Sequence, residues 1–268
     1  MYLCKMFKKL GIILLISLFL GSCSKYQKLL KSSDYEKKYE MGILYYEKGD
    51  YTRAYNLLEE LHGIYKGTKR AEKVYFYLAG SHYGKKEYIM AGYHYGMFAR
   101  TYPNSEYTEE AFYKSAYCAY LNASPSSLDA AFTQDGIKTL QLFVDKYPKS
   151  NYVQECNGLI DELRSRLEDK AFRNAKLYYN IADYKAAGIA LKNVLLDYPD
   201  TKYHEEILYL IVKSSYILAK KSIRSKQNER YQKSIDEYFV FIDEFPNSKK
   251  ISEVEKLYHK SREFLNKQ

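Results

Sequence analysis

The chain repeats one short motif, an aromatic residue followed by a helix breaker and then by Ser or Thr. Its four near-copies are Tyr102-Pro103-Asn104-Ser105, Tyr147-Pro148-Lys149-Ser150, Tyr198-Pro199-Asp200-Thr201 and Phe245-Pro246-Asn247-Ser248. A degenerate fifth copy is Tyr65-Lys66-Gly67-Thr68. Proline cannot continue a helix, and a Ser or Thr side chain can cap the first turn of the next one. Each copy therefore predicts the end of one helix and the start of another.

Positions counted back from this motif share side-chain size. Twelve residues before the proline position the residue is small, and eight and five residues before it the residue is large. Offsets of four and three place these residues on one face of a helix. The small residues are Ala54, Ala91, Gly136, Ala187 and Ser234, and the large ones are Leu58, Tyr95, Leu140, Leu191, Tyr238, Leu61, Phe98, Phe143, Val194 and Phe241. The preceding helix of each unit has its own small residue, at Gly42, Ala79, Ala116, Ala175 and Ser215.

This fixed order is typical of tetratricopeptide repeats, which are helix-turn-helix units of about 34 residues. The sequence predicts an all-α protein, a right-handed α-solenoid of about five tetratricopeptide (TPR) repeats, with a C-terminal capping helix at Ile251–Leu265. Three segments depart from the period. Leu121–Ser127 predicts a loop, Lys220–Asn228 predicts a similar insertion that is basic and polar, and Val153–Lys170 predicts an extended helix.

The N-terminal residues resemble a secretion signal. Lys5, Lys8 and Lys9 precede an apolar run, Leu10–Leu20, that is too short to span a bilayer. Leu20-Gly21-Ser22-Cys23 resembles a bacterial lipobox, which implies acyl chains such as palmitate on Cys23 and hence stable membrane anchoring. We therefore expect a signal peptide at 1–22, and the lipidated Cys23 with a polar tether at 23–34. A short membrane anchor or an initiating core helix is the alternative.

Composition and motifs argue against catalysis. Without the three leader lysines, the 42 basic residues become 39 against 33 acidic ones, and they are scattered rather than striped, so we expect no nucleic-acid partner. The chain has no Gly-rich phosphate loop, HExxH, CxxC or GxSxG motif, and its five His lack ligand-like spacing. Cys118 and Cys156 are expected to be buried thiols, with a disulfide between them as the alternative. We expect no enzyme activity, no metal and no cofactor beyond the lipid on Cys23.

Tyrosines recur on the first helix of the first three units. In a TPR array this helix lines the concave wall, chiefly with residues three before and one, four and five after its small residue. A tyrosine-rich wall offers rigid apolar faces with a hydrogen-bonding tip, which suits extended or hairpin peptides. Packing inside the repeats is the alternative role for these side chains. The expected peptide-binding residues are Tyr39, Ile43, Tyr46, Phe76, Tyr83, Tyr113, Tyr117 and Tyr120.

The lipobox, the repeat units and two further stretches together resemble the BamD (YfiO) family of outer-membrane protein assembly lipoproteins, in the style of Bacteroidetes-type members. The stretches are Ala171–Tyr179 running on to Tyr198–Thr201, and Pro103-Asn104-Ser105 followed by Tyr107 and Glu109-Glu110. The resemblance implies a lipid-anchored protein on the periplasmic face of the outer membrane. Its role would be to help fold and insert β-barrel proteins together with the barrel protein BamA, with other Bam lipoproteins as further partners.

The resemblance also implies a division of labour along the chain. Units 1–3 (35–148) would bind the signal strands of unfolded outer-membrane β-barrel proteins. Units 4–5 with the capping helix (149–268) would dock the periplasmic domains of BamA, through roughly Leu177–Ser248. The alternative function is a periplasmic TPR adaptor that coordinates envelope constriction or peptidoglycan synthesis. Such adaptors usually carry a coiled-coil segment and no lipobox, whereas this chain has Cys23 and no heptad block.

Overall fold

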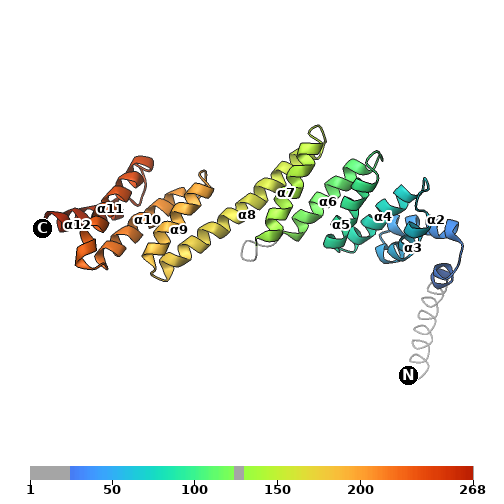
Figure 1. Ribbon diagram of the computed structural model, residues 1–268, viewed down its shortest axis with the longest axis horizontal. Helices are drawn as coiled ribbons and strands as arrows, with labels where there is room; N and C mark the ends of the chain where they lie inside the picture. Colours follow the sequence, from blue (N-terminus) through green and yellow to red (C-terminus); the bar gives the residue numbers. More distant parts are fainter. Residues whose placement is uncertain (1–24, 124–129, 268) are drawn as a thin grey trace, which may run out of the picture. The chain divides into compact units, whose positions relative to one another are not determined.

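The structure is a computed structural model that describes residues 25–123 and 130–267 (Figure 1). All regular secondary structure in these two stretches is helical. The helices are α2 (Tyr35–Glu47), α3 (Tyr51–Ile64), α4 (Ala71–Gly84), α5 (Tyr88–Thr101), α6 (Thr108–Asn122), α7 (Ala131–Lys146), α8 (Val153–Asn180), α9 (Tyr184–Asp197), α10 (His204–Lys220), α11 (Arg224–Glu244) and α12 (Ile251–Asn266). The predicted signal peptide and the expected lipidation site, Cys23, lie outside the described residues, as does most of the loop predicted at Leu121–Ser127.

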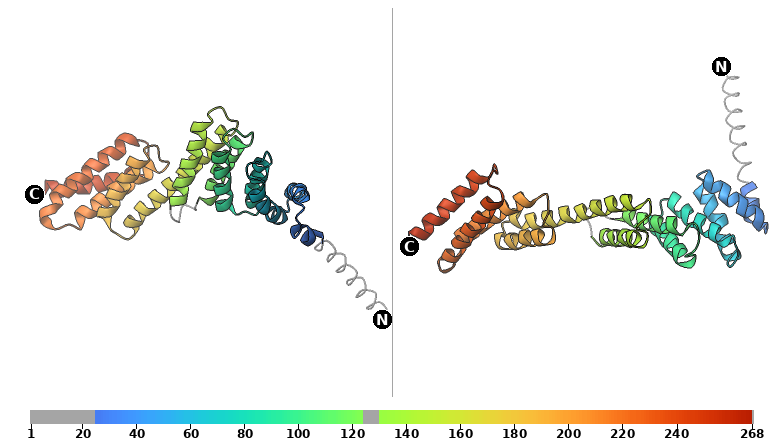
Figure 2. Two further views of the ribbon diagram at one scale, coloured as in Figure 1. Left: turned by 45° about the vertical axis from the view of Figure 1, so that its right-hand side comes forward. Right: turned by 90° about the horizontal axis from the view of Figure 1, so that it is seen from above.

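Consecutive helices pair into hairpins. α2 packs against α3, α4 against α5, α6 against α7 and α10 against α11. Phe172 and Ala175 of α8 share a core with Leu191 of α9. Two further views show the paired helices from other directions (Figure 2). α12 packs on α11 and α10, in the place predicted for a capping helix. The all-α class and the tandem TPR hairpins are confirmed.

The chain divides into two compact units, and each is described by itself. Unit 1 contains the described residues up to Ala123 together with Ala131–Ile160, and unit 2 contains Ala130 and the residues from Asp161 onward. The division falls inside α8. The 28 residues of α8 confirm the extended helix predicted at Val153–Lys170. Cys118 and Cys156, both in unit 1, are buried free thiols, so the disulfide alternative is excluded.

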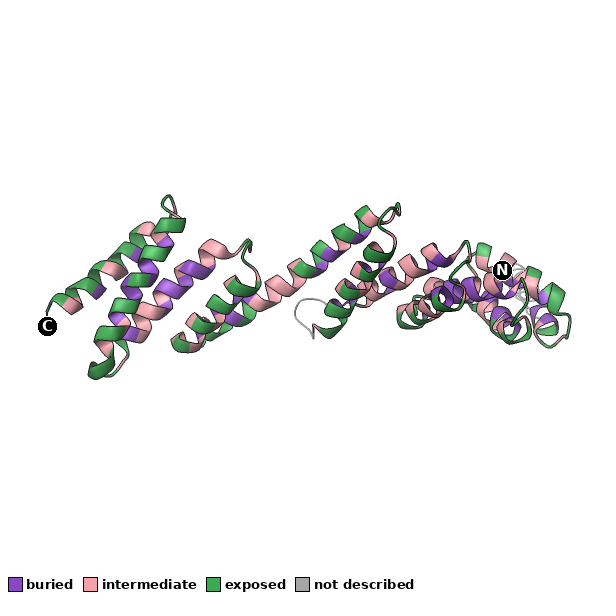
Figure 3. Cartoon of the chain, turned by 45° about the horizontal axis from the view of Figure 1, so that its top comes forward, coloured by how far each residue is buried: buried purple, intermediate pink, exposed green. Residues whose placement is uncertain are grey.

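The predicted register of the second helix in each hairpin is confirmed. Every small and large residue named for it is buried, from Ala54, Leu58 and Leu61 in α3 to the corresponding residues of α11. Figure 3 shows that buried positions recur along the helices. The small residues let the paired helices approach, and the large ones fill the space beside them. Burying one large apolar side chain stabilises a fold by about 1.5–3 kcal/mol. The register thus accounts for much of the packing within each unit.

One small residue of the first helices is wrongly predicted. Ser215 is only half-buried. Ala79 and Ala116 lie nine residues after the N-caps of their helices, and Val212 holds this position in α10. Val212 is 0% exposed. The buried position of the first helix is therefore set by its distance from the N-cap, and a β-branched residue such as Val212 can occupy it. The prediction failed because it required a small side chain.

Three hairpins share one turn geometry. Gly49, Lys86 and Ala182 have positive φ values of 77°, 63° and 64°. In each turn the N–H of this residue donates to the carbonyl three residues earlier, and the N–H of the next residue donates to the carbonyl five residues earlier. This Schellman pattern satisfies the last carbonyls of the first helix. The residues that follow are the N-caps of the second helices, namely Asp50, Glu87 and Asp183.

The Ser and Thr residues of the repeated motif do not occupy the predicted N-cap position but lie two residues before it. Each accepts a hydrogen bond from the backbone N–H two residues later, at 3.0–3.4 Å. The helices begin three residues after them, and the N-cap residues of α4, α6, α10 and α12 make no capping bond with their side chains. These hydroxyls therefore close the turn that leads into the helix. The residues concerned are Thr68, Ser105, Ser150, Thr201 and Ser248.

The insertion predicted at Lys220–Asn228 is largely helical. α10 runs to Lys220 and α11 begins at Arg224, so only residues 221–223 connect the two helices. The added residues lengthen α11 to 21 residues. They include Arg, Lys, Gln and Glu, which are good helix formers. A polar composition was therefore a poor indicator of a loop at this place.

The segment expected to be a polar tether is folded in its described part. Residues 25–30 are helical. Tyr26 and Leu29 are 7% and 9% exposed, and they pack with Leu57 of α3. Their spacing of three residues puts both side chains on one face of the helical segment. The surrounding Lys, Gln and Ser residues masked this short apolar pattern in the sequence.

Candidate peptide-binding surface

The tyrosines of α2, α4 and α6 in unit 1 form the candidate site. Most of the side chains expected to line a peptide groove are half-buried, so each keeps an accessible face. Phe76 differs, because it is 8% exposed and belongs to the core of unit 1. Its ring stacks on that of Tyr107 at 4.8 Å. The half-buried residues are Tyr39, Ile43, Tyr46, Tyr83, Tyr113, Tyr117 and Tyr120.

Tyr46 lies between two neighbouring tyrosines. Its ring centroid is 4.7 Å from that of Tyr77 in α4 and 5.5 Å from that of Tyr51 in α3. A Cβ built on Gly80 would lie 2.6 Å from the Tyr46 hydroxyl oxygen, so the missing side chain lets this ring lie against α4. Burial raises the pKa of Tyr46 to about 12. Its hydroxyl therefore keeps its proton at neutral pH.

Tyr83 lies near the end of α4, beside a charged pair from α6. Its ring centroid is 5.7 Å from that of Tyr88. Lys114 Nζ lies 5.4 Å from the Tyr83 ring centroid and 3.5 Å from a carboxylate oxygen of Glu110. A partly exposed cation–π contact of this kind contributes about 0.5–1 kcal/mol. Lys114 thus holds the Tyr83 ring and places one cation beside the aromatic surface.

Three tyrosine rings follow one face of α6. The Tyr113 ring is stacked on that of Tyr152 at 3.9 Å and 8°. Tyr117 lies 5.9 Å from Tyr113 and 5.8 Å from Tyr120, measured between ring centroids. Burial, and then a hydrogen bond to Glu155, raise the pKa of Tyr113 well above its usual value. Rings already held by one another lose little conformational entropy when a ligand binds.

At the other end of the surface, an arginine covers Tyr39. The Tyr39 ring packs edge-on to Tyr65 at 6.0 Å. The guanidinium carbon of Arg70 lies 4.9 Å from the Tyr39 ring centroid, and the same guanidinium pairs with Glu36. A ligand that reached the Tyr39 face would therefore meet both charges.

Sequence reasoning missed two tyrosines of this surface. Tyr77 is half-buried and touches Tyr46, whereas the register three residues before the small residue selected its buried neighbour Phe76. Tyr152 precedes α8 and stacks on Tyr113, but it belongs to no repeat position that we considered. The run of aromatic residues at 75–77 could have indicated Tyr77. Helical periodicity alone could not decide which of these adjacent rings lies at the surface.

The described residues carry no sign of metal or thiol chemistry. Within them, no three or more His, Cys, Asp or Glu side chains are grouped so that they could hold a metal ion. Burial raises the pKa of Cys118 to about 12 and that of Cys156 to about 11, so both thiols stay protonated at neutral pH. None of the helices described for 25–123 and 130–267 is both long and apolar enough to cross a membrane.

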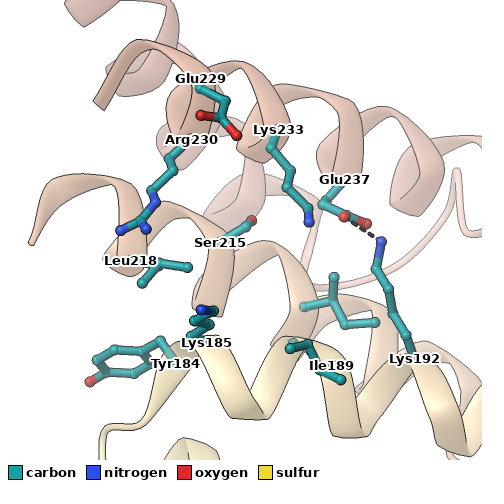
Figure 4. A pocket seen from close by; sticks show the side chains of 12 residues that line it. Tyr184, Lys185, Ile189, Lys192, Ser215, Leu218, Glu229, Arg230, Lys233 and Glu237 are labelled. Atoms are coloured by element: carbon teal, nitrogen blue, oxygen red, sulfur yellow. Dashed lines mark hydrogen bonds and ion pairs between the residues drawn. The ribbon is translucent and has the colours of Figure 1, made fainter. Parts of the chain in front are cut away.

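Unit 2 has a basic pocket of about 260 Å³ between α9, α10 and α11 (Figure 4). Lys192 Nζ donates a hydrogen bond to Glu237 Oε1 at 2.5 Å, so these two charges neutralise each other. Lys185 and Lys233 have no ion-pair partner among the described residues. The side chains around the pocket include Tyr184, Lys185, Ile189, Lys192, Leu218, Arg230 and Lys233, together with the acids Glu229 and Glu237. The combination of apolar and basic side chains suits an acidic group from a partner.

Comparison with known families identifies the family of this chain. Residues 31–230 match the YfiO family, which is described as an outer membrane lipoprotein family. This match covers most of the chain, and the chain belongs to that family.

Three relatives of similar sequence share the name BamD. The chain is 26% identical to an outer membrane protein assembly factor BamD of Aquifex aeolicus, over 92% of this chain and 81% of that protein. It is 21% identical to the outer membrane protein assembly factor BamD of Caulobacter vibrioides, over 72% of this chain and 64% of that protein. The BamD of Pasteurella multocida is 22% identical, with 76% and 82% covered.

Solved TPR structures are more distant. A complex of the TPR2AB domain of yeast Sti1 with pHSP90 matches at a TM-score of 0.41 and 12% identity, covering 86% of this chain and 99% of that one. The TPR domain of P58(IPK) matches at 0.41 and 12%, covering 90% and 68%.

Proposed function

We propose that this protein is a lipid-anchored outer-membrane protein assembly factor. In this role it is a non-catalytic scaffold that binds unfolded β-barrel proteins and BamA, and so promotes insertion of the barrels into the outer membrane. The family match over residues 31–230, together with relatives named as BamD assembly factors, carries the proposal. Cys23 would hold the lipid that fixes the protein to the periplasmic face of the outer membrane.

The tyrosine surface of unit 1 supports binding of an unfolded strand. A barrel strand outside its sheet exposes unpaired N–H and C=O groups and alternating aromatic side chains. Half-buried tyrosines offer flat faces for the aromatic side chains and protonated hydroxyls for the backbone carbonyls. The stacked pair Tyr113 and Tyr152 and the ring of Tyr46 against Gly80 are already ordered, which lowers the entropic cost of binding.

We place the BamA contact on unit 2, within roughly Leu177–Ser248. The pocket of Figure 4 lies in this range, and its free lysines, Lys185 and Lys233, would attract a carboxylate of the partner. Joining a strand-binding unit and a BamA-binding unit in one chain raises the effective concentration of the strand near BamA without any covalent step. Other Bam lipoproteins are further candidate partners.

The groove assignment is tested by removing three tyrosines together, Tyr46→Ala, Tyr83→Ala and Tyr117→Ala. We expect affinity for C-terminal peptides of barrel proteins to fall by about tenfold or more, because aromatic anchors dominate such interfaces. The matched control replaces Tyr35, Tyr93 and Tyr178, which are 38%, 56% and 42% exposed elsewhere on the chain. Circular dichroism checks that both variants stay helical. Unchanged peptide binding in the first variant, or an equal loss in the control, contradicts the groove.

Crosslinking in envelopes tests the partner. Recovery of BamA through residues of unit 2 supports the assembly role. Recovery of Tol proteins or murein enzymes in its place supports the TPR adaptor of envelope constriction and overturns the proposal.

A further inference from the structure

The N-terminal segment, defined here as residues 25–33, is fastened to the first hairpin. Tyr26 is 7% exposed, and its hydroxyl accepts a hydrogen bond from Asn56 Nδ2 at 3.1 Å. The Tyr26 ring packs edge-on to Tyr45 at 5.7 Å. The guanidinium carbon of Arg53 lies 5.3 Å from the Tyr26 ring centroid and 5.6 Å from that of Tyr45. The segment is therefore held by specific polar and aromatic contacts.

A buried lysine completes this attachment. The Lys38 side chain is 1% exposed, which is rare for a lysine unless its charge is satisfied. Its Nζ donates to the Leu30 carbonyl at 3.0 Å and to Glu60 Oε2 at 2.6 Å. Because Leu30 lies in the N-terminal segment and Glu60 in α3, this one cation ties the segment to the hairpin.

The attached segment and α2 enclose a groove of about 520 Å³. Its apolar side chains include Tyr26, Leu29 and Met41. Three lysines, Lys25, Lys28 and Lys37, also line it and are exposed. Among the described residues these lysines have no ion-pair partner. Asp34, the one acid among the described residues of the groove, caps α2 by accepting a hydrogen bond from the Lys37 N–H at 3.0 Å.

The covalent chain limits how far this groove can be from the lipid. Lys25 follows Cys23 by two residues, and two residues span at most roughly 7 Å. Resting on the proposed lipidation of Cys23, this places the groove at the level of the membrane headgroups. Lysines next to an acyl anchor are attracted to anionic lipid, and a second contact of this kind strengthens anchoring.

We propose that the groove binds the headgroup of an anionic phospholipid in the membrane that carries the anchor. Lys25, Lys28 and Lys37 would contact the phosphate, and the apolar side chains would contact the glycerol and the first acyl carbons. The attachment through Lys38 and Tyr26 would then fix the orientation of the first hairpin at the membrane surface.

The test uses the mature chain from residue 23 with Cys23→Ser, so that binding does not depend on acyl chains. Flotation is measured with vesicles of phosphatidylglycerol mixed with phosphatidylcholine, and with vesicles of phosphatidylcholine alone. We expect binding to the first kind only. The variant with Lys25→Gln, Lys28→Gln and Lys37→Gln should bind at least about tenfold more weakly, since one lysine near an anionic surface contributes about fivefold.

The matched control removes the same charge from exposed lysines elsewhere, as Lys249→Gln, Lys256→Gln and Lys260→Gln. It should keep vesicle binding. An equal loss in this control, or no preference of the parent chain for the anionic vesicles, overturns the proposal. Inorganic phosphate should displace the chain from anionic vesicles more than chloride of equal ionic strength does, because both ligands offer a phosphate to the same lysines. Binding of inorganic phosphate by the parent chain without any binding to anionic vesicles would mean that the groove takes a free anion and would contradict a membrane role.

Two readouts keep this inference separate from the proposed function. Mass spectrometry of the protein from membranes reports the lipid on Cys23. Affinity for barrel C-terminal peptides should be the same in the Lys25, Lys28 and Lys37 variant as in the parent chain. The tyrosine variant should lose peptide binding and keep vesicle binding, and the lysine variant should lose vesicle binding and keep peptide binding. This pair of results would support both the proposed function and the lipid groove.

Discussion

Units 1 and 2 use the same hairpin but different side-chain chemistry. Both buried cores combine aromatic and aliphatic side chains, but the half-buried layer packed on the core of unit 1 is almost entirely tyrosine. The half-buried layer of unit 2 mixes tyrosines such as Tyr179 and Tyr203 with aliphatic residues such as Leu195 and Leu257. Lys–Glu pairs join its helices, as where Glu206 of α10 meets Lys176 of α8 at 2.9 Å and Lys250 at 3.3 Å.

Under the proposed function, the difference would let one repeat serve two binding tasks. The tyrosines packed on the core of unit 1 present half-buried rings, which are apolar on their faces and polar at the tip. In unit 2, aliphatic side chains interrupt this layer of tyrosines, and Lys–Glu pairs join the helices. Unit 1 would thereby suit aromatic strands and unit 2 a polar protein partner.

The largest expected effect comes from emptying either core. Phe98→Ala should lower the free energy of unfolding of unit 1 by about 3–5 kcal/mol, and Phe241→Ala should do the same for unit 2. Both side chains are 0% exposed. Hydrogen exchange measured helix by helix should show the loss confined to the unit that carries the change. A loss shared equally by both units would show that the two cores do not act separately.

A smaller effect should separate the helix packing of the two units. A Cβ on Gly84 would lie 2.3 Å from ring atoms of Tyr51, so Gly84→Ala should destabilise unit 1 by about 1–3 kcal/mol. Gly188 in α9 has no heavy atom within 4 Å of its added Cβ. Gly188→Ala should therefore stabilise unit 2 by about 0.5–1 kcal/mol through helix propensity. Urea unfolding of both variants measures these changes, and equal signs would contradict the packing described.

Unit 2 should gain stability from one apolar replacement. Ser234 stands where Ala54, Ala91 and Ala187 stand in other hairpins, and its buried hydroxyl has no hydrogen-bond partner in the described part of the chain. Ser234→Ala should stabilise the protein by about 1 kcal/mol, because an unsatisfied buried hydroxyl is removed. Ser261→Ala is the control, since that buried hydroxyl donates to the Leu257 carbonyl at 2.9 Å. A gain in the control and none at Ser234 would contradict this account.

The smallest expected effect concerns pH. In unit 1, burial lowers the pKa of His62 and of His94 below 6.5. The unfolded chain then binds protons more readily than the fold, so unit 1 should lose stability as pH falls below 6.5. In unit 2, Lys176 lowers the pKa of Glu206 and Tyr209 lowers that of Glu253 below 4.5. Their contribution is present above pH 4.5 and is lost as pH falls through the lowered values.

Hydrogen exchange corrected for intrinsic rates measures this difference. Between pH 6.5 and 4.5, α3 to α5 should lose protection while α9 to α11 keep it. The change should be small because these side chains are partly exposed and screened. The variant with His62→Gln and His94→Gln should abolish the early loss. Loss in unit 2 first would contradict the assignment.

Much of the fold could be predicted from the sequence because the repeated register reports packing directly. A residue such as Ala54 or Phe241 meets its neighbouring helix in every hairpin, so its size recurs along the chain. The surface carries no such constraint. Phe76 and Tyr77 are adjacent rings, and Phe76 is the buried one because the rings of Tyr95, Phe98 and Tyr107 pack on it.

Other features depended on contacts distant in sequence. The N-terminal segment is ordered by Leu57, Asn56 and the Lys38–Glu60 pair, none of which marks residues 25–30 as helical. Tyr152 joins the aromatic surface only because α6 and the residue before α8 lie side by side. Local patterns cannot specify such pairings.

The left-handed turn residue has a consequence for how this architecture diverges. Because the backbone hydrogen bonds are the same at Gly49, Lys86 and Ala182, the turn can be inherited without its glycine. The glycine that marks such a turn most clearly can therefore be lost in evolution while the geometry of the turn is kept. The more constant sequence signal is the acidic N-cap residue followed by a tyrosine. A search that required glycine would miss two of these three turns.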